Sequence, residues 1–207
     1  MKKIVFIRIT TITILCFGVN KIYAQSEAKK FRYTFNSGIG MYNPLIRDAK
    51  LASSGLLFSF QLQANYKTKY FSRIAFSQFS LDYKGSFKLN GLNIKMEDRL
   101  ETLTLGIDLG YVFYQKNKFN SYAFLDTGVA AIYTPIITYD NGSTDFNISK
   151  QVNLFQLLNT GIGFEYKLHK LLILSAEFQY TDIPYKTDLS NTQLNGIISQ
   201  LNFKTNF

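Results

Sequence analysis

Hydrophobic and polar side chains alternate between residues 56 and 66, which predicts a β-strand with two chemically different faces. One face carries Leu56, Phe58, Phe60, Leu62, Ala64 and Tyr66, and the other carries Leu57, Ser59, Gln61, Gln63 and Asn65. Successive side chains of a strand point to opposite sides, so the first face is fully apolar and the second is almost fully polar. Such a strand fits at a boundary between an apolar and a polar environment.

Eight segments are predicted as strands, and seven of them keep this segregation over their central part. The predicted ranges are 31–42, 56–66, 70–84, 101–114, 119–134, 152–166, 171–181 and 196–207. Short basic turns at 67–69, 115–118 and 167–170 alternate with long polar segments at 43–55, 85–99, 135–151 and 182–195. Short turns on one side and long loops on the other are typical of outer-membrane barrels, and both termini then lie at the periplasmic end.

The third predicted strand changes phase along its length. Ile74 and Phe76 have one parity, whereas Phe79 and Leu81 have the other. One extra residue near positions 77–78 would form a β-bulge and return all four side chains to the apolar face. The pattern therefore predicts a bulge in this strand.

Together these patterns predict an all-β protein, an eight-stranded antiparallel up-and-down transmembrane β-barrel with an apolar exterior and a polar interior. Tilted strands of about 10 residues are long enough to span a bilayer. Tyrosines near the predicted strand ends, Tyr42 and Tyr122 among them, fit two interfacial aromatic girdles. A secreted, lipocalin-like barrel with its apolar face turned inward is the soluble alternative.

The first 24 residues have the layout of a cleaved secretory signal peptide. A basic start is followed by an apolar stretch over 9–19 and a plausible cleavage site before Gln25. That stretch is too short to span a bilayer as a helix. Cys16 is the only cysteine and lies inside this segment, so residues 25–207, the predicted outer-membrane β-barrel domain, contain no thiol.

The net charge of the chain limits the kinds of molecule that it is expected to bind. The chain carries a formal net charge of +9, and removal of residues 1–24 takes away four basic residues and no acids, which leaves +5. No basic cluster interleaved with aromatic residues remains, so we expect no nucleic-acid binding. The expected surroundings are outer-membrane lipid, reached by export to the bacterial outer membrane.

The assembled pattern resembles the small outer-membrane β-barrel families: OmpX, the OmpA membrane domain and the PorT-like "porin family" barrels. The resemblance rests on the signal peptide, the eight amphipathic strands and a last strand with Leu201, Phe203 and Phe207 on one face. In these families a terminal strand that ends in Phe resembles the signal read by the barrel assembly machinery. The resemblance therefore implies that this machinery is a partner.

Seven charged residues fall on the predicted inner face: Arg32, Arg73, Asp108, Asp126, Glu165, Glu177 and Lys204. Neighbouring strands bring Arg73 within reach of Asp108, and Lys204 within reach of Glu177. Buried charges need partners, so the network predicts a structural plug of salt bridges. An ion path or proton relay is the functional alternative for the same residues.

Enzymatic chemistry is not expected. Nucleophilic catalysis needs a base, and the only histidine, His169, falls in a short turn away from the long loops. One histidine and no cysteine beyond residue 24 argue against a catalytic zinc site, and no cofactor is expected. We therefore predict a non-enzymatic structural or interaction barrel, serving envelope integrity, adhesion or an envelope complex through its long loops. A narrow pore or transport protein is the alternative.

Overall fold

The computed structural model describes residues 31–45, 54–67, 69–89, 92–139, 146–184 and 194–206. The chain divides into two units, residues 1–31 and 32–207, and every described residue except Phe31 belongs to the second. The predicted signal peptide and Phe207 lie outside the described residues. No helix in these described ranges is long and apolar enough to cross a membrane.

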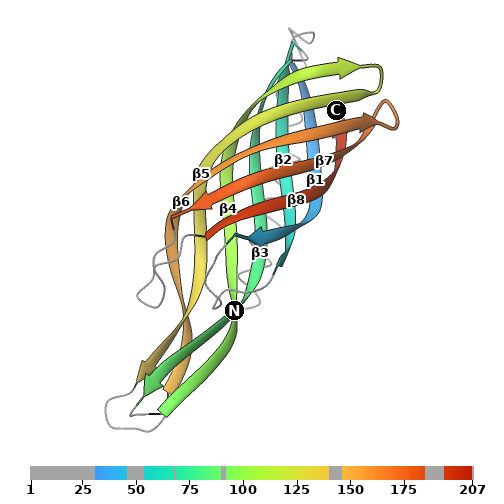
Figure 1. Cartoon of the computed structure of the whole chain (residues 1–207). Coiled ribbons are helices and arrows are strands. Elements are labelled where there is room, and N and C mark those ends of the chain that lie inside the picture. Colours follow the sequence, from blue (N-terminus) through green and yellow to red (C-terminus); the bar gives the residue numbers. More distant parts are fainter. Residues whose placement is uncertain are drawn as a thin grey trace. The chain divides into compact units, whose positions relative to one another are not determined.

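Eight antiparallel strands follow one another around a closed barrel, as predicted (Figure 1). They are β1 (Phe31–Pro44), β2 (Gly55–Tyr66), β3 (Tyr70–Leu89), β4 (Leu92–Lys116), β5 (Phe119–Tyr139), β6 (Phe146–Lys167), β7 (Leu172–Ile183) and β8 (Leu194–Asn206). β1 pairs with β8, from Thr34 opposite Asn206 to Pro44 opposite Gly196, which closes the sheet. Closure leaves the membrane-spanning part without an open edge, as lipid requires.

The predicted faces of the strands are confirmed from the short turns to the middle of the barrel. In β2, Leu56, Phe58 and Phe60 are about half exposed on the outside, whereas Ser59 and Gln61 are buried inside. The exterior repeats this pattern on other strands with exposed Ile74, Leu105, Ile107, Leu109, Leu125, Val129, Ile162, Leu201 and Phe203. A belt of this kind is matched by hydrocarbon and not by water, which makes the barrel a transmembrane one.

The predicted bulge in β3 is wrong. β3 pairs with β2 and β4 in continuous register from Tyr70 to Phe79, and Phe79 and Leu81 therefore point inward. Phe79 stacks on Tyr42 inside the barrel, with ring centroids 4.3 Å apart and planes 6° apart. The register shift that does occur lies between Val112 and Tyr114 of β4. The phase change in the sequence marks a change in the interior, which is apolar at this level.

The barrel interior thus has two layers. The layer nearer the short turns is polar and charged. The layer nearer the long connections is an apolar cluster of Tyr42, Leu57, Phe79, Leu81, Leu100, Ala130, Ile132, Leu157, Ile183, Leu194 and Ile198. The prediction of a polar interior therefore holds for the layer nearer the short turns and is wrong for the layer nearer the long connections. The assignment of Tyr42 to an interfacial girdle is also wrong.

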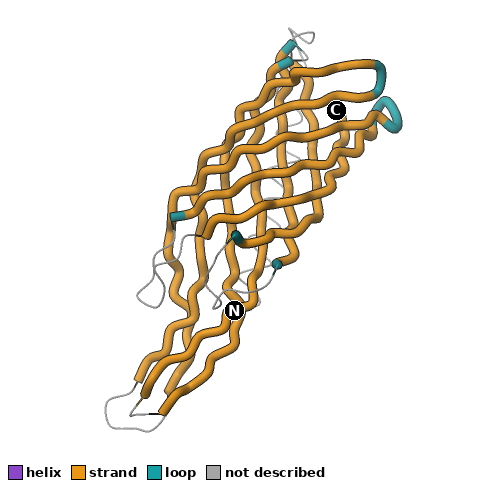
Figure 2. Tube along the Cα trace, viewed as in Figure 1, coloured by secondary structure: helices purple, strands orange, loops and turns teal. Residues whose placement is uncertain are grey.

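Two hairpins are longer than the alternation predicted. β3 and β4 stay paired up to Leu89 opposite Leu92, and β5 and β6 stay paired up to Tyr139 opposite Phe146. The segments predicted as loops at 85–99 and 135–151 are therefore largely strand (Figure 2). Strand pairing satisfies backbone groups regardless of side-chain pattern, so polar residues do not by themselves end a strand. Both hairpins project past the other strands at the long-loop end (Figure 1).

Candidate functional site

The candidate site is the charged layer of the lumen, and Arg73 of β3 lies at its centre. Asp108 of β4 is its direct neighbour in the strand register, and Arg73 Nε donates to Asp108 Oδ2. Arg73 Nη1 reaches across the lumen to Glu177 Oε1 of β7 at 2.5 Å. Both partners are buried, with side-chain exposures of 1% for Arg73 and 0% for Glu177. Arg73 therefore ties together two sides of the barrel.

Glu177 is the most heavily bonded acid in this layer. Tyr122 Oη donates to its Oε1 at 2.5 Å. Its other oxygen, Oε2, accepts from Gln200 Nε2 at 2.6 Å and from Gln179 Nε2 at 3.2 Å. Hydrogen bonds from several protein donors stabilise a buried carboxylate.

Lys204 of β8 continues the network toward the short turns. Its Nζ lies 2.8 Å from Glu165 Oε1, 3.2 Å from Tyr122 Oη and 3.9 Å from Glu177 Oε1. Asn120 Nδ2 donates to the second oxygen of Glu165 at 3.1 Å. The ion pairs therefore link Asp108, Arg73, Glu177, Lys204 and Glu165 in that order, with acid and base alternating.

Aromatic rings line the same layer and hold the cations from the side. The Arg73 guanidinium lies 4.3 Å from the ring centroid of Phe124 and 5.6 Å from that of Phe71. Lys204 Nζ lies 4.8 Å from the centroid of Tyr122. Desolvated cations over ring faces gain electrostatic stabilisation, so the rings strengthen the network and exclude water from it.

The rings fit because glycine stands beside each of them. Gly110 is opposite Phe71 in the register, and Gly163 is opposite Tyr122. A Cβ atom at Gly163 would lie 2.2 Å from the Tyr122 ring, and one at Gly110 would lie 2.0 Å from the Phe71 ring. A side chain at either position would therefore force the neighbouring ring or the backbone to move.

The structure brings most of the predicted charged residues into one place. Asp108, Arg73, Glu177, Lys204 and Glu165 form the alternating network described above. Asp126 lies beside it and accepts from Asn159 Nδ2 at 2.6 Å. Arg32 does not take part, because it is exposed near the start of β1, although its parity is that of the inner face.

Tyr122 is a member of the charged network that the sequence analysis placed elsewhere. Its position near a short turn suggested an interfacial girdle, but its side chain is 1% exposed and bonds both Glu177 and Lys204. The parity rule would have found it, because Tyr122 shares the inward parity of Asp126. The uncharged partners Gln179 and Gln200 were also missed as members of the network.

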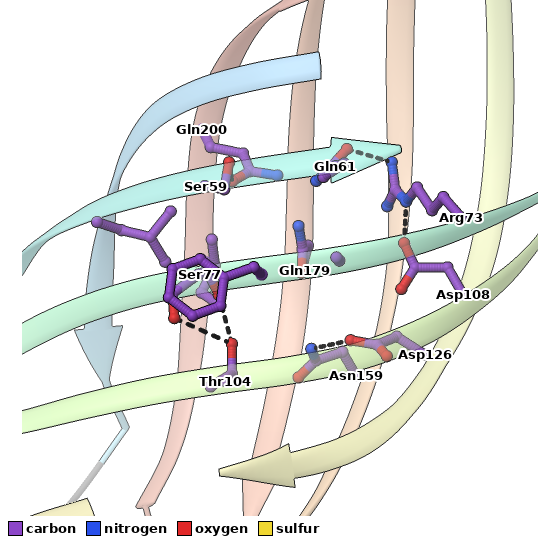
Figure 3. A pocket seen from close by; sticks show the side chains of 14 residues that line it. Ser59, Gln61, Arg73, Ser77, Thr104, Asp108, Asp126, Asn159, Gln179 and Gln200 are labelled. Atoms are coloured by element: carbon purple, nitrogen blue, oxygen red, sulfur yellow. Dashed lines mark hydrogen bonds and ion pairs between the residues drawn. The ribbon is translucent and has the colours of Figure 1, made fainter. Parts of the chain in front are cut away.

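The charged layer encloses only a small space. A cavity of about 20 Å³ lies among Arg73, Asp108, Asp126, Asn159 and neighbouring polar side chains, which come from several strands (Figure 3). That volume holds about one water molecule. Asn159 and Asp126 are joined by a hydrogen bond at one side of it, and Asp108 approaches from the side of Arg73 (Figure 3). Side chains therefore fill the lumen at this level.

The histidine of the sequence lies away from this cavity. His169 lies exposed in the turn between β6 and β7, where its Nδ1 accepts from the backbone N–H of Leu171 at 3.5 Å. Among the described residues, no group of three or more His, Cys, Asp or Glu side chains is arranged to hold a metal ion. The geometry suits a structural network.

Comparison with known proteins agrees with this fold. No protein-family model matches the sequence, and no curated protein matches it. The outer membrane protein OprG from Pseudomonas aeruginosa matches at 15% identity with a TM-score of 0.61, over 86% of this chain and 97% of OprG. A major outer membrane protein from Thermus thermophilus matches at 12% identity with a TM-score of 0.57, over 86% and 99% of the two chains.

The attachment invasion locus protein Ail of Yersinia pestis, in complex with the heparin analogue sucrose octasulfate, also matches. Its identity is 12% and its TM-score is 0.54, over 86% of this chain and 99% of Ail. At these identities the likeness concerns the fold. The chain has the fold of the small eight-stranded outer-membrane β-barrels, antiparallel and up-and-down.

Proposed function

We propose that the protein is a non-enzymatic, closed barrel of the bacterial outer membrane that carries an interaction surface on its two projecting hairpins. The observation that carries this proposal is the filled lumen. Paired charges fill it near the short turns, and an apolar cluster fills it near the long connections. A sealed barrel does not conduct, so its projecting hairpins are what it offers to the outside. Export by the predicted signal peptide and insertion by the barrel assembly machinery through Leu201, Phe203 and Phe207 belong to this proposal.

The projecting hairpins have features of a docking surface. Among the described residues, the pairing of β3 with β2 ends at Phe79, and that of β6 with β7 ends at Leu158. The pairing of β4 with β5 ends at Glu101 opposite Tyr133. Beyond these points the hairpins present strand edges, which can pair with a strand of another protein. An envelope protein is the partner that fits this geometry.

Photo-crosslinking in whole cells tests the interaction surface. A photoreactive amino acid in place of Asp82, which is exposed on β3, should give a discrete protein adduct. The same residue in place of Lys170, which is exposed in the short turn at the other end, is the control. Adducts from position 170 alone, or none from position 82, would contradict a partner on the hairpins.

Conductance decides between the closed barrel and the pore. The interior of an eight-stranded barrel is about filled by its own side chains, and here those side chains are paired. We expect no stable conductance steps from the wild-type protein in planar bilayers, and intermittent steps from Arg73→Ala, which removes the central side chain. Large, stable steps from the wild type would overturn the closed barrel in favour of transport.

A further inference from the structure

Two acids of the lumen face each other on neighbouring strands. Asp108 of β4 and Asp126 of β5 are direct partners in the strand register, and both point inward. They are 1% and 4% exposed. Like charges directly opposite on one face of a sheet repel, and burial makes the repulsion stronger. Arg73 bonds only one of the two, through Asp108 Oδ2.

The charge balance of the lumen points the same way. Its described buried side chains include two cations and four acids. The cations are Arg73 and Lys204, and the acids are Asp108, Asp126, Glu165 and Glu177. Two positive charges against four negative charges leave a formal charge of −2. The alternating network accounts for one excess acid, and Asp126 is the second. A sealed, low-dielectric interior needs a counter-charge for this excess.

Three buried oxygen atoms around the cavity have no hydrogen-bond donor among the described residues. They are Asp108 Oδ1, Asp126 Oδ1 and Asn159 Oδ1. Asn159 is 6% exposed, and its amide nitrogen is already used by Asp126 Oδ2. All three residues line the cavity of about 20 Å³, which is large enough for one ion (Figure 3). Carboxylate and amide oxygens are the ligands that hard cations prefer.

Gly106 shapes the same site. It lies on β4 two residues before Asp108 and shares its inward parity. A Cβ atom at Gly106 would lie 2.1 Å from Asp126 Oδ1, so the bare backbone is what admits the carboxylate here. The carboxylate of Asp126, on β5, therefore lies over β4, the strand that carries Asp108.

We propose that this cavity binds one divalent cation, and that this cation is Ca²⁺. Its ligands are the carboxylates of Asp108 and Asp126 and the amide oxygen of Asn159. A divalent ion cancels the whole excess charge. A shared proton would cancel half of it and would provide a donor to only one of the three oxygens. Ca²⁺ tolerates irregular oxygen geometry, whereas Mg²⁺ keeps a shell of water that this cavity does not have room for.

Thermal unfolding of the purified protein tests the site. The protein is refolded into phosphatidylcholine vesicles with Ca²⁺, or with chelator and choline chloride at equal ionic strength, and followed by circular dichroism. We expect the Tm to rise by about 5–10 °C at a Ca²⁺ concentration roughly a hundredfold above its Kd. After dialysis, elemental analysis should find one Ca²⁺ per chain.

Two variants locate the ion. Asp126→Asn removes one charge and adds an N–H donor for Asp108, so the Ca²⁺ response should disappear and the Tm in chelator should rise. Glu165→Gln also removes one lumen charge, but Glu165 does not line the cavity, so its Ca²⁺ response should remain. Should Asp126→Asn fail to fold, the Ca²⁺ content of the wild type decides.

Several results would overturn the proposal. A wild-type Tm that responds to lower pH and not to Ca²⁺ would mean that the two acids share a proton. A Ca²⁺ response that survives Asp126→Asn would place the ion elsewhere. A wild type without bound Ca²⁺ and without a Tm response would leave only water in the cavity.

Discussion

Replacing Glu177 with alanine is expected to lower the free energy of unfolding by about 3–5 kcal/mol, the usual cost of removing one partner from a buried ion pair. Glu177 is fully buried and accepts from Arg73, Tyr122, Gln179 and Gln200. Its removal leaves Arg73 with Asp108 as its acid partner and leaves Lys204 with Glu165. Water cannot replace these contacts without opening the lumen, so the whole penalty falls on the folded state.

Urea titration in lipid vesicles, followed by heat-modifiable migration on gels, measures this effect. Glu101→Ala is the matched control, since it breaks the ion pair with Lys150, whose Nζ lies 3.0 Å from Glu101 Oε1. That pair is partly exposed, at 36% and 43%, and its loss should cost about 0–1 kcal/mol. Equal losses from the two variants would show that the lumen is hydrated.

Replacing Leu105 with arginine is expected to cost about 2–4 kcal/mol, the cost of arginine on the lipid face near the bilayer midplane. Leu105 is 51% exposed on the outside of β4. It lies six residues from Tyr111, which is exposed near the short turns. Six residues of a tilted strand rise by about 15 Å, close to half of the apolar belt.

Leu168→Arg is the control for depth. Leu168 is 49% exposed, but it lies in the short turn after β6, beside Lys167. The same change there should cost about 0–1 kcal/mol, because charge is tolerated near the interface. Thr104→Arg, on the inner face, should act through overpacking and not through lipid. Similar tolerance at 105 and 168 would mean that the exterior of β4 does not face hydrocarbon.

The two expected effects describe one design. Lipid outside requires apolar side chains at alternate positions, and the remaining positions must then share a narrow space. With eight strands this space holds side chains and little else, so charges placed there must pair with one another. In this chain the pairing is nearly complete at Glu177 and incomplete at Asp126.

Much of this could be read from the sequence because the parity of a strand is a local property. The eight strands, their closure and the outward set from Leu56 to Phe203 follow from alternation and turn spacing. The pairing of Arg73 with Asp108 also follows, since consecutive strands joined by a hairpin are neighbours. Each of these inferences needs only residues that are close along the chain or joined by one turn.

Only the tertiary structure decided how the interior is filled. Arg73 meets Glu177 across the lumen, a contact between β3 and β7 that depends on the curvature of the closed sheet. The inward stacking of Phe79 on Tyr42 shows that an apolar side chain can face either lipid or an apolar plug. The alternation of apolar and polar residues shows that the two faces of a strand differ. It does not show whether an apolar face contacts lipid or other side chains in the lumen. Closure of the barrel decides that, because it alone sets which distant side chains share the lumen.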